Sequence, residues 1–256
     1  MYSSDVRLHA LALMGRGISL RSISMSTGIS RATLHDWREQ PEISVRPRAV
    51  CSRCVGNSTL PEPQADYAYL LGLYLGDGCI SLAGARDKKV WKLRIICADA
   101  WPGLLLECER AMSAVRPTNK VSTQQNVGCV EVMSCSRHWP CLFPQHGPGR
   151  KHMRKIELQP WQRTIVVANP GRFARGLLHS DGYRGLNRVR ARLADGDHWY
   201  EYARYIFTNE SSDILRLCGE TLDQLGVAWR FSRRNAISVA RREAVARLDE
   251  VVGPKY

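Results

Sequence analysis

Hydrophobic and polar positions change their spacing several times along this chain of 256 residues. Over the first forty residues, apolar positions recur at helical intervals in three short segments. A glycine turn at Gly28 separates the last two segments, and Ser19 and Ser30 stand where N-cap residues are expected. Two short helices joined by such a turn predict a helix-turn-helix module over residues 1–40.

A helix-turn-helix module places its second helix in the major groove of DNA. In this chain the DNA-facing side chains of that helix are predicted to be Arg31, Thr33, His35 and Arg38. A three-helix bundle that binds no ligand would show the same apolar pattern, and it stays open as the alternative.

Residues 41–65 have no periodic pattern and include four prolines, which predicts a linker. Cys51 and Cys54 lie in this linker with the spacing of one half of a zinc site. The second half of such a site is missing nearby. A loose downstream cluster consists of Cys135, His138, Cys141 and His146. Zinc binding and reduced, metal-free cysteines therefore both remain open.

Beyond the linker, the pattern alternates between helical and strand-like spacing, and it does so twice. Each round reads helix, two strands, helix, two strands, helix, over residues 66–145 and again over 169–256, with a connector at 146–168. An Asp195-Gly196 turn in the second round indicates a hairpin. An internal repeat of roughly a hundred residues predicts an α+β fold, a pseudo-twofold duplicated αββαββα domain.

The helices that open the two rounds end in similar segments, LLGLYLGDG and ARGLLHSDG. When the segments are aligned, Gly72 coincides with Gly176, and Asp77 coincides with Asp181. An aspartate at a helix C-terminus opposes the negative end of the helix dipole, so another role has to explain it. Close packing of the two helices at their glycines would bring both carboxylates side by side.

Two adjacent carboxylates repel each other unless a cation neutralises them. Oxygen ligands favour hard cations, so Mg²⁺ or Mn²⁺ is the expected cofactor. Carboxylate pairs that hold divalent metal are suited to the attack of water on a phosphodiester bond.

The two segments, each followed by two predicted strands, resemble the paired signature of the LAGLIDADG homing endonuclease family over residues 66–256. The resemblance implies that the signature helices form the interface between two half-domains, and that a saddle of antiparallel strands lies in the DNA major groove. It also implies that Asp77 and Asp181 bind catalytic metal, with the carbonyl groups of Gly76 and Ser180 beside it.

The predicted function is thus that of a site-specific, double-strand DNA endonuclease of the intron-homing type. Some regulators combine a LAGLIDADG-like domain with a helix-turn-helix and have lost cleavage, so a non-cleaving transcriptional regulator is the main alternative. An RNA-splicing maturase is a third. His179 departs from the family's usual apolar or small residue and is expected to be a core residue, a neighbour of the site or a DNA contact.

The net charge of +13 and an isoelectric point near 9.6 indicate a polyanionic partner, here double-stranded DNA. Period-two spacing places basic side chains of the predicted strands on shared faces. Strand residues predicted to contact DNA are Lys92, Arg94, Arg184, Arg188, Arg190, Arg192, Arg204, Arg230 and Arg234. Lys92 and Arg204 are also candidates to assist the attacking water. A solvated basic face is the simpler alternative.

The segment around the connector, residues 136–162, is rich in histidine, proline and basic residues. Arg150, Lys151 and Lys155 are predicted to touch phosphate, and a Cys/His or HNH-type metal site is the alternative. No apolar run approaches the ~20 residues of a membrane span, and nine cysteines form no obvious disulfide framework. A monomeric cytoplasmic protein associated with the nucleoid, with no membrane partner, is expected.

Overall fold

The computed structural model describes residues 4–39, 60–84, 89–193, 196–253 and 255. The chain divides into two compact units, residues 1–57 and residues 58–256. Each unit is described by itself. The predicted zinc ligands Cys51 and Cys54 lie outside the described residues.

The first unit contains three short helices, α1 (Ser4–Gly15), α2 (Leu20–Thr27) and α3 (Arg31–Glu39). The hydroxyl of Ser19 accepts a hydrogen bond from the backbone N–H of Ser22 at 3.1 Å. Ser30 caps α3 in the same way, through the N–H of Thr33. Gly28 follows α2 with a φ of 70°, a left-handed conformation that favours glycine. The predicted caps and turn are therefore formed.

A small apolar core holds the three helices together. Leu34 and Trp37 of α3 point inward, as the apolar spacing predicted. The core residues are Ala10, Ile23, Ile29, Leu34 and Trp37. With so few apolar side chains buried, this unit gains little hydrophobic stabilisation compared with the second one.

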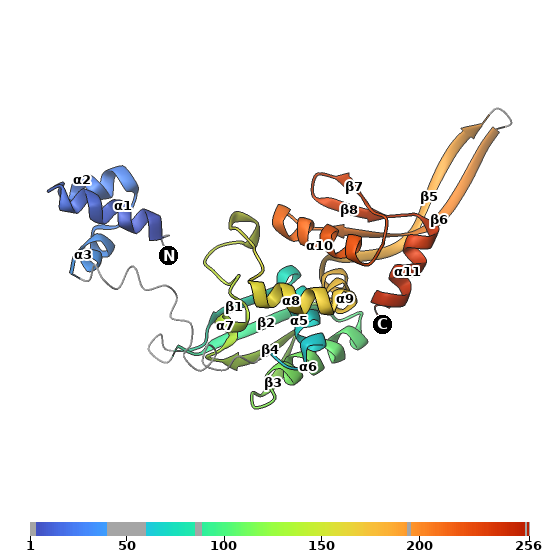
Figure 1. Ribbon diagram of the computed structural model, residues 1–256, viewed down its shortest axis with the longest axis horizontal. Coiled ribbons are helices and arrows are strands. Elements are labelled where there is room, and N and C mark those ends of the chain that lie inside the picture. Colours follow the sequence, from blue (N-terminus) through green and yellow to red (C-terminus); the bar gives the residue numbers. More distant parts are fainter. Residues whose placement is uncertain (1–3, 40–59, 85–88, 194–195, 254, 256) are drawn as a thin grey trace. The chain divides into compact units, whose positions relative to one another are not determined.

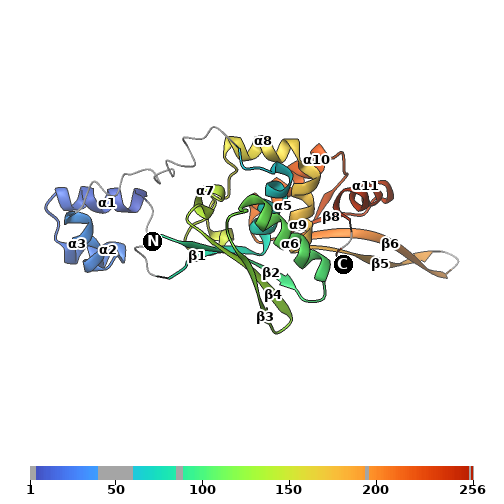
Figure 2. The same cartoon turned by 90° about the horizontal axis from the view of Figure 1, so that it is seen from below.

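The second unit is an α+β structure built around two antiparallel four-stranded sheets (Figures 1 and 2). Its first half contains α5 (Gln64–Gly76), β1 (Gly78–Leu82), β2 (Trp91–Ala98), α6 (Pro102–Val115), β3 (Val121–Asn126) and β4 (Cys129–Ser136). Its second half contains α9 (Pro170–Asp181), β5 (Gly182–Leu193), β6 (Gly196–Thr208), α10 (Ser212–Gln224), β7 (Arg230–Arg233), β8 (Ala236–Val239) and α11 (Arg242–Val252).

The strands follow one another in the same way in both sheets. The first sheet has the order β1-β2-β4-β3, and the second has the order β5-β6-β8-β7. The long β5–β6 hairpin projects well beyond the helices (Figure 1). The second unit thus has the predicted fold class and the predicted alternation of helices and strand pairs.

Helices cover one face of each sheet, as Figure 2 shows with the helices above the strands. In the first sheet, alternate residues of β2 are buried beneath them, including Leu93 and Ile95. In the second sheet, Tyr205 and Phe207 of β6 are buried in the same manner. Period-two burial of this kind fixes which face of each strand meets the core.

Helices α5 and α9 lie against each other at the centre of the unit, and glycines form their contact. A Cβ atom added at Gly72 would lie 2.7 Å from the backbone nitrogen of Leu177. One added at Gly176 would overlap the carbonyl oxygen of Tyr69. The backbones therefore approach too closely for any side chain, as the aligned glycines predicted.

The connector is more structured than its composition suggested. It contains the 3₁₀ turn η3 (Lys151–Met153) and α8 (Pro160–Ala168), and the short helix α7 (Trp139–Leu142) precedes it at the end of the first half. Gln162 of α8 is buried and donates to the hydroxyl of Tyr67 at 2.7 Å, while Gln145 donates to Gln162 at 2.6 Å. This buried polar network ties the connector to α5, which sequence periodicity could not indicate.

We expect Gly176→Ala to destabilise the second unit by about 2 kcal/mol or more, because the methyl group overlaps backbone that cannot move aside without separating the helices. Urea unfolding followed by circular dichroism measures the change. Gly147→Ala is the matched control, since its Cβ would meet only the flexible side chain of Arg154, at 3.4 Å. Equal stabilities of the two variants would contradict the close helix contact.

Candidate functional site

The contact between α5 and α9 brings the two C-terminal aspartates into one site. A Cβ atom at Gly76 would overlap the side chain of Ser180 and lie 3.0 Å from Oδ2 of Asp181. Gly76 is the last residue of α5 and Asp77 follows it, so the end of each helix meets the end of the other. The structure thus gathers all four residues that the resemblance assigned to the metal site.

The pKa values of both carboxyl groups are raised in this site. Loss of surrounding water and the negative charge of Asp181 raise the pKa of Asp77 to about 6. Burial also raises the pKa of Asp181, although a hydrogen bond from Asn209 opposes the shift. Asn209 donates to Oδ2 of Asp181 at 2.6 Å. The charges of Lys151 and Lys255 act in the opposite direction on the pKa of Asp77.

Two lysines stand beside the aspartates. Nζ of Lys151 donates hydrogen bonds to the carbonyl oxygens of Tyr74 at 2.6 Å, Leu75 at 2.9 Å, and Gly76. Burial lowers the pKa of Lys151 to about 8, while the two carboxylates act to raise it. Lys151 was predicted only as a phosphate contact, and nothing in the local sequence indicated this position.

The second lysine is Lys255, whose Nζ donates to the carbonyl oxygen of Gly182 at 2.7 Å. Burial lowers its pKa, and Asp77 and Asp181 again oppose the shift. Sequence reasoning missed both Lys255 and Asn209, because each lies far along the chain from the residues it meets. Two ammonium groups now face two carboxylates, so the formal charges of the four groups cancel when all are ionised.

The oxygen donors of the site fit a hard divalent cation. Two carboxylates converge there with the carbonyl of Gly76, and oxygen-only donor sets of this kind are typical of Mg²⁺ and Mn²⁺ sites. Ser180 uses its hydroxyl within α9, donating to the carbonyl of Leu177 at 2.9 Å. Over the described ranges there is no group of three or more His, Cys, Asp or Glu residues placed to hold a metal, so the Cys/His alternative for the connector is not formed there.

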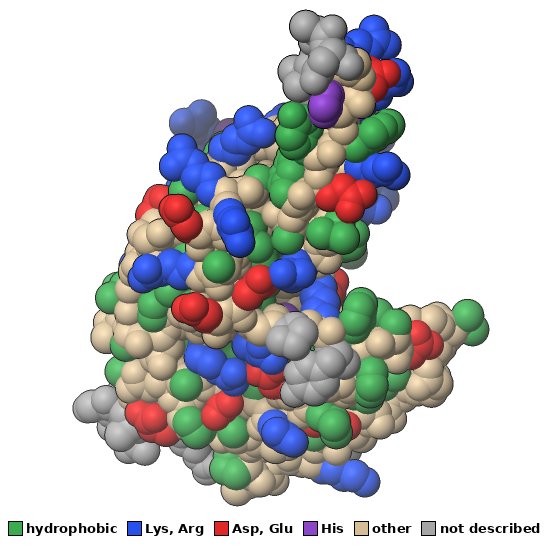
Figure 3. All heavy atoms as spheres, turned by 90° about the vertical axis from the view of Figure 1, so that its right-hand side faces the viewer, with side chains coloured by type: hydrophobic (Ala, Val, Ile, Leu, Met, Phe, Trp, Pro, Cys, Tyr) green, Lys and Arg blue, Asp and Glu red, His purple; other side chains and the backbone are tan. Residues whose placement is uncertain are grey.

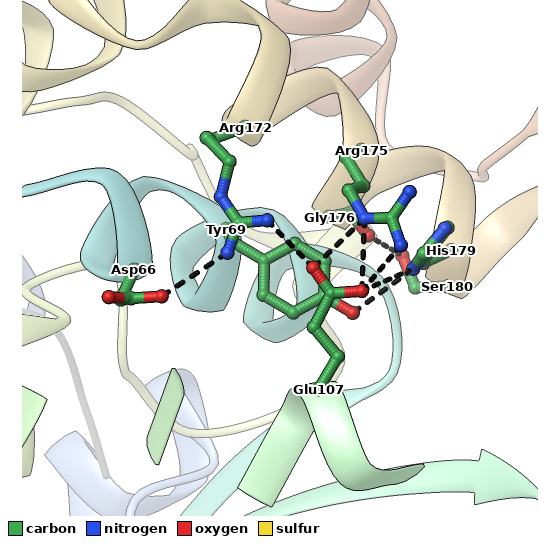
Figure 4. Close-up of polar contacts among 8 residues, drawn as sticks. All are labelled: Asp66, Tyr69, Glu107, Arg172, Arg175, Gly176, His179 and Ser180. Atoms are coloured by element: carbon green, nitrogen blue, oxygen red, sulfur yellow. Dashed lines mark hydrogen bonds and ion pairs between the residues drawn. The ribbon is translucent and has the colours of Figure 1, made fainter. Parts of the chain in front are cut away.

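A charged cluster next to the site joins the first half to the second (Figure 4). Glu107 of α6 accepts hydrogen bonds from Arg172 at 2.7 Å and from Arg175 at 2.6 Å, both on α9. Arg172 also donates to Asp66 at the start of α5. Bidentate pairs of this kind fix orientation as well as supplying energy.

His179 belongs to this cluster. Its Nδ1 lies 3.0 Å from the hydroxyl of Tyr69, and only 1% of its side chain is exposed. Burial and the charge of Arg175 lower the pKa of His179 to about 3, so the ring is neutral near pH 7. Of the three roles considered for His179, that of a core residue agrees with the structure, because the ring is buried.

The basic residues of β5 share a face, as predicted, but the base of that face turns toward the helices. Arg184 pairs in register with buried Tyr205 and donates to Asp249 of α11 at 2.6 Å. Residues opposite each other in a ladder lie on one face of the sheet. Arg184, one of the predicted DNA contacts, therefore lies on the face that the helices cover, because period-two spacing groups side chains without saying which group the helices cover.

Toward the tip of the β5–β6 hairpin, the face of the sheet that carries Arg184 extends past the helices and is exposed to solvent. Arg188 pairs with Glu201 at 3.3 Å and lies over the ring of Trp199, and Arg190 pairs with Asp197. Arg192 is exposed nearby. Figure 3 shows Lys and Arg side chains over the projecting hairpin, interleaved with hydrophobic ones, and a hollowed surface beside its base.

The uncovered faces of the two sheets carry other predicted residues. Lys92 and Arg94 alternate with buried Leu93 and so point away from the helices, and Arg94 donates to Sγ of Cys79 at 3.1 Å. Arg204 lies opposite Gly185, on the face away from Tyr205. Among the remaining predicted strand contacts are exposed Arg230 and Arg234.

Arg230 borders a hollow on the second sheet with a volume of about 490 Å³. Tyr202, Trp229 and Arg241 also line it. In the first unit, Arg31, His35 and Arg38 are exposed along α3, whereas the hydroxyl of Thr33 lies 2.8 Å from that of Ser30. Three of the four predicted groove residues of α3 are thus free of the core.

Solved structures similar to the chain include two LAGLIDADG homing endonucleases and a LAGLIDADG domain of another protein. The homing endonuclease I-DmoI in complex with DNA and Mn aligns with a TM-score of 0.46 and 14% identity, over 75% of this chain and 99% of that chain. The LAGLIDADG meganuclease I-AabMI bound to uncleaved DNA gives 0.45 and 12%, over 72% and 83%. The N-terminal LAGLIDADG domain of DUF199/WhiA gives 0.40 and 14%, over 78% and 86%.

No family model and no curated protein matches the sequence. With TM-scores below 0.5, the likeness to solved structures does not decide an activity for this chain. Among the described residues, no helix combines the length and apolar character needed to cross a membrane.

We expect Asp77→Asn to stabilise the metal-free protein increasingly as pH rises. A raised pKa means that folded Asp77 keeps its proton to about pH 6, whereas the unfolded chain loses it near pH 4, so stability falls across this window. The free energy of unfolding of the variant should equal that of the parent below pH 4 and be larger than that of the parent above pH 6. Asp77 is partly dehydrated but still exposed, so water screens its charge. The gain in the free energy of unfolding should therefore be about 1 kcal/mol or less.

Denaturant unfolding in the presence of a chelator, repeated from pH 4 to 8, measures this difference. Asp99→Asn, which removes an exposed carboxylate outside the site, is the matched control and should show no comparable trend. A difference between Asp77→Asn and the parent that does not change with pH would contradict the raised pKa of Asp77.

Proposed function

We propose that this protein is a site-specific endonuclease of the homing type, which hydrolyses phosphodiester bonds of double-stranded DNA with a divalent metal ion. The observation that carries the proposal is the meeting of Asp77 and Asp181 at the ends of two closely packed helices. A strongly basic chain with uncovered sheet faces supports DNA as the substrate.

In this proposal, Asp77, Asp181 and the carbonyl of Gly76 hold Mg²⁺ or Mn²⁺, with the Ser180 carbonyl as a further neighbour. Bound metal would stabilise negative charge on the attacking and leaving oxygens of the phosphodiester. Asn209 fixes one oxygen of Asp181 through its 2.6 Å hydrogen bond and leaves the other available. The helix contact at the glycines sets the spacing of both carboxylates.

The DNA-binding surface is proposed on the sheet faces that the helices leave open. Lys92 and Arg94 would serve the first sheet, and Arg204 and Arg230 the second, with contacts to phosphates and base edges. Arg188, Arg190, Arg192 and Arg234 would act where the hairpin and the sheet edge extend past the helices. Arg184 is excluded from this set, because Asp249 holds it on the helix side.

The two halves are proposed to be related by a pseudo-twofold axis between α5 and α9, with half-domains at 66–145 and 169–256. One chain then supplies both aspartates, which makes a monomer sufficient for activity. The halves differ in sequence at their basic positions, so the DNA site would be asymmetric. The helix-turn-helix of residues 1–40 would add contacts outside the cleaved positions.

Asp77→Asn and Asp181→Asn should each abolish cleavage while leaving DNA affinity within about threefold of the parent, because each removes a metal-holding carboxylate without touching the basic faces. The test incubates each protein with a randomised duplex library in Mg²⁺ and sequences all new ends. Discrete ends made only by the parent are expected.

Absence of new ends with the parent, together with specific retention of certain sequences, would instead identify a non-cleaving DNA-binding regulator. One observation favours this second candidate: two lysines already balance the charge of the aspartate pair. Loss of DNA binding in both aspartate variants would count against a metal site and for a purely structural role.

Replacing Arg31 and Arg38 together with alanine should weaken DNA binding and lower the salt slope by up to about two units, because each phosphate contact releases counterions. Both side chains are exposed on α3, so the core of the first unit is left intact. Binding isotherms between 50 and 200 mM salt give the slope. A slope equal to that of the parent would remove the DNA-binding role from this helix.

A further inference from the structure

We propose that the ammonium group of Lys151 is an internal cation that closes the metal site in the DNA-free protein, and that a divalent metal ion binds there only when this side chain leaves. The inference deepens the proposed function and rests on it. It assigns to Lys151 a positioning role that controls access to the carbonyl of Gly76.

The first step of the argument is the geometry at the end of α5. The last carbonyls of a helix have no intrahelical partners and carry the negative end of its dipole. Lys151 satisfies three of them at once, on Tyr74, Leu75 and Gly76. Its ammonium therefore lies where a cation is most strongly attracted, beside the paired carboxylates.

The second step is that the two cations compete for the same oxygen. The Gly76 carbonyl, a proposed metal ligand, accepts a hydrogen bond from Lys151. The carbonyl oxygen has two lone pairs, so the hydrogen bond by itself does not fill the oxygen, but an ammonium and a metal ion held at one oxygen repel each other strongly. This repulsion disfavours metal binding in the DNA-free protein until the Lys151 side chain moves away.

Lys255 makes a matched comparison within the same site. It carries the same charge and also neighbours both aspartates, but it donates to the carbonyl of Gly182, which is not among the proposed ligands. Removing Lys255 changes the charge balance alone. Removing Lys151 changes the charge balance and also frees a ligand oxygen.

The third step is that the side chain can move without its backbone. Lys151 lies in the short turn η3, and Arg154 anchors the loop before it by donating to the carbonyl of Gly149 at 2.6 Å and to that of Gln145 at 3.2 Å. Release of the ammonium, whose Nζ lies 5.3 Å from the centre of the Tyr74 ring, therefore requires only rotation of the lysine side chain. A DNA phosphate reaching the site would offer the ammonium a new partner.

The test measures Mn²⁺ affinity of the full-length, DNA-free protein by electron paramagnetic resonance of unbound Mn²⁺. Lys151→Gln should bind Mn²⁺ at least tenfold more tightly than the parent. Lys255→Gln should gain no more than about threefold, through charge alone. Lys151→Arg, which keeps a cation at the helix end, should stay close to the parent.

Lys155→Gln controls for loss of a basic residue in the same segment, since Lys155 is exposed and paired with Glu157. Its Mn²⁺ affinity should equal that of the parent. Lys151→Met keeps the aliphatic stem and provides a second test if the glutamine variant fails to fold, as judged by circular dichroism. Unchanged or weaker Mn²⁺ affinity in a folded Lys151→Gln or Lys151→Met protein overturns the inference.

A parallel measurement separates this inference from the proposed function. If the parent neither binds Mn²⁺ nor cuts DNA in the presence of its retained duplex, the proposed endonuclease activity fails and the inference fails with it. If the parent binds Mn²⁺ and cuts DNA, yet Lys151→Gln without DNA binds Mn²⁺ no more tightly, the inference alone is overturned. Tighter Mn²⁺ binding by Lys151→Gln that Asp77→Asn abolishes in the double variant supports both.

Discussion

The close approach of two helix backbones, at Gly72 and Gly176, is the contact on which the rest of the second unit depends. Because neither residue has a side chain, α5 and α9 meet along their length and end at the same place. Asp77 and Asp181 are then neighbours. This placement is electrostatically unfavourable, because each carboxylate lies at the negative end of a helix dipole and beside a second negative charge. One sheet follows each of these helices along the chain, so the same contact also positions the sheet faces that the helices leave uncovered.

Charge repulsion at the helix ends has to be offset by something, and in this protein lysines do it. Lys151 comes from the connector and Lys255 from the end of the described chain, and each meets a backbone carbonyl beside the aspartates. The arrangement stabilises the metal-free fold. For an enzyme, the same arrangement would hold the site in a resting state until substrate supplies another partner for a lysine.

The two halves share their order of elements but not their contacts. Glu107 of the first half binds two arginines of α9, and it lies beside the buried ring of His179. Arg184 of the second half is held by Asp249, whereas Arg94 in the first half faces away from the helices. Under the proposed function, such differences would suit a single chain that binds two unlike half-sites, because each half can be adjusted without the other.

The sequence by itself determined most of the fold. Apolar spacing located α5, α9 and nearly every strand, and Ser19, Ser30 and Gly28 set the helix limits in the first unit. It also paired Asp77 with Asp181, because glycines and aspartates recur at matching positions in both segments. Local patterns carry this information because caps, turns and periodicity are properties of neighbouring residues.

Only the tertiary structure decided the rest. Lys151, Asn209 and Lys255 reach the aspartates from distant parts of the chain, and no local pattern encodes a long-range contact. The burial of Gln145 and Gln162 could not be predicted from these polar residue types, because a buried amide needs a hydrogen-bond partner such as Tyr67. Likewise, the period-two spacing placed the arginines of β5 on one face of the strand. Only the packing of the helices determined that this face is the one they cover at its base.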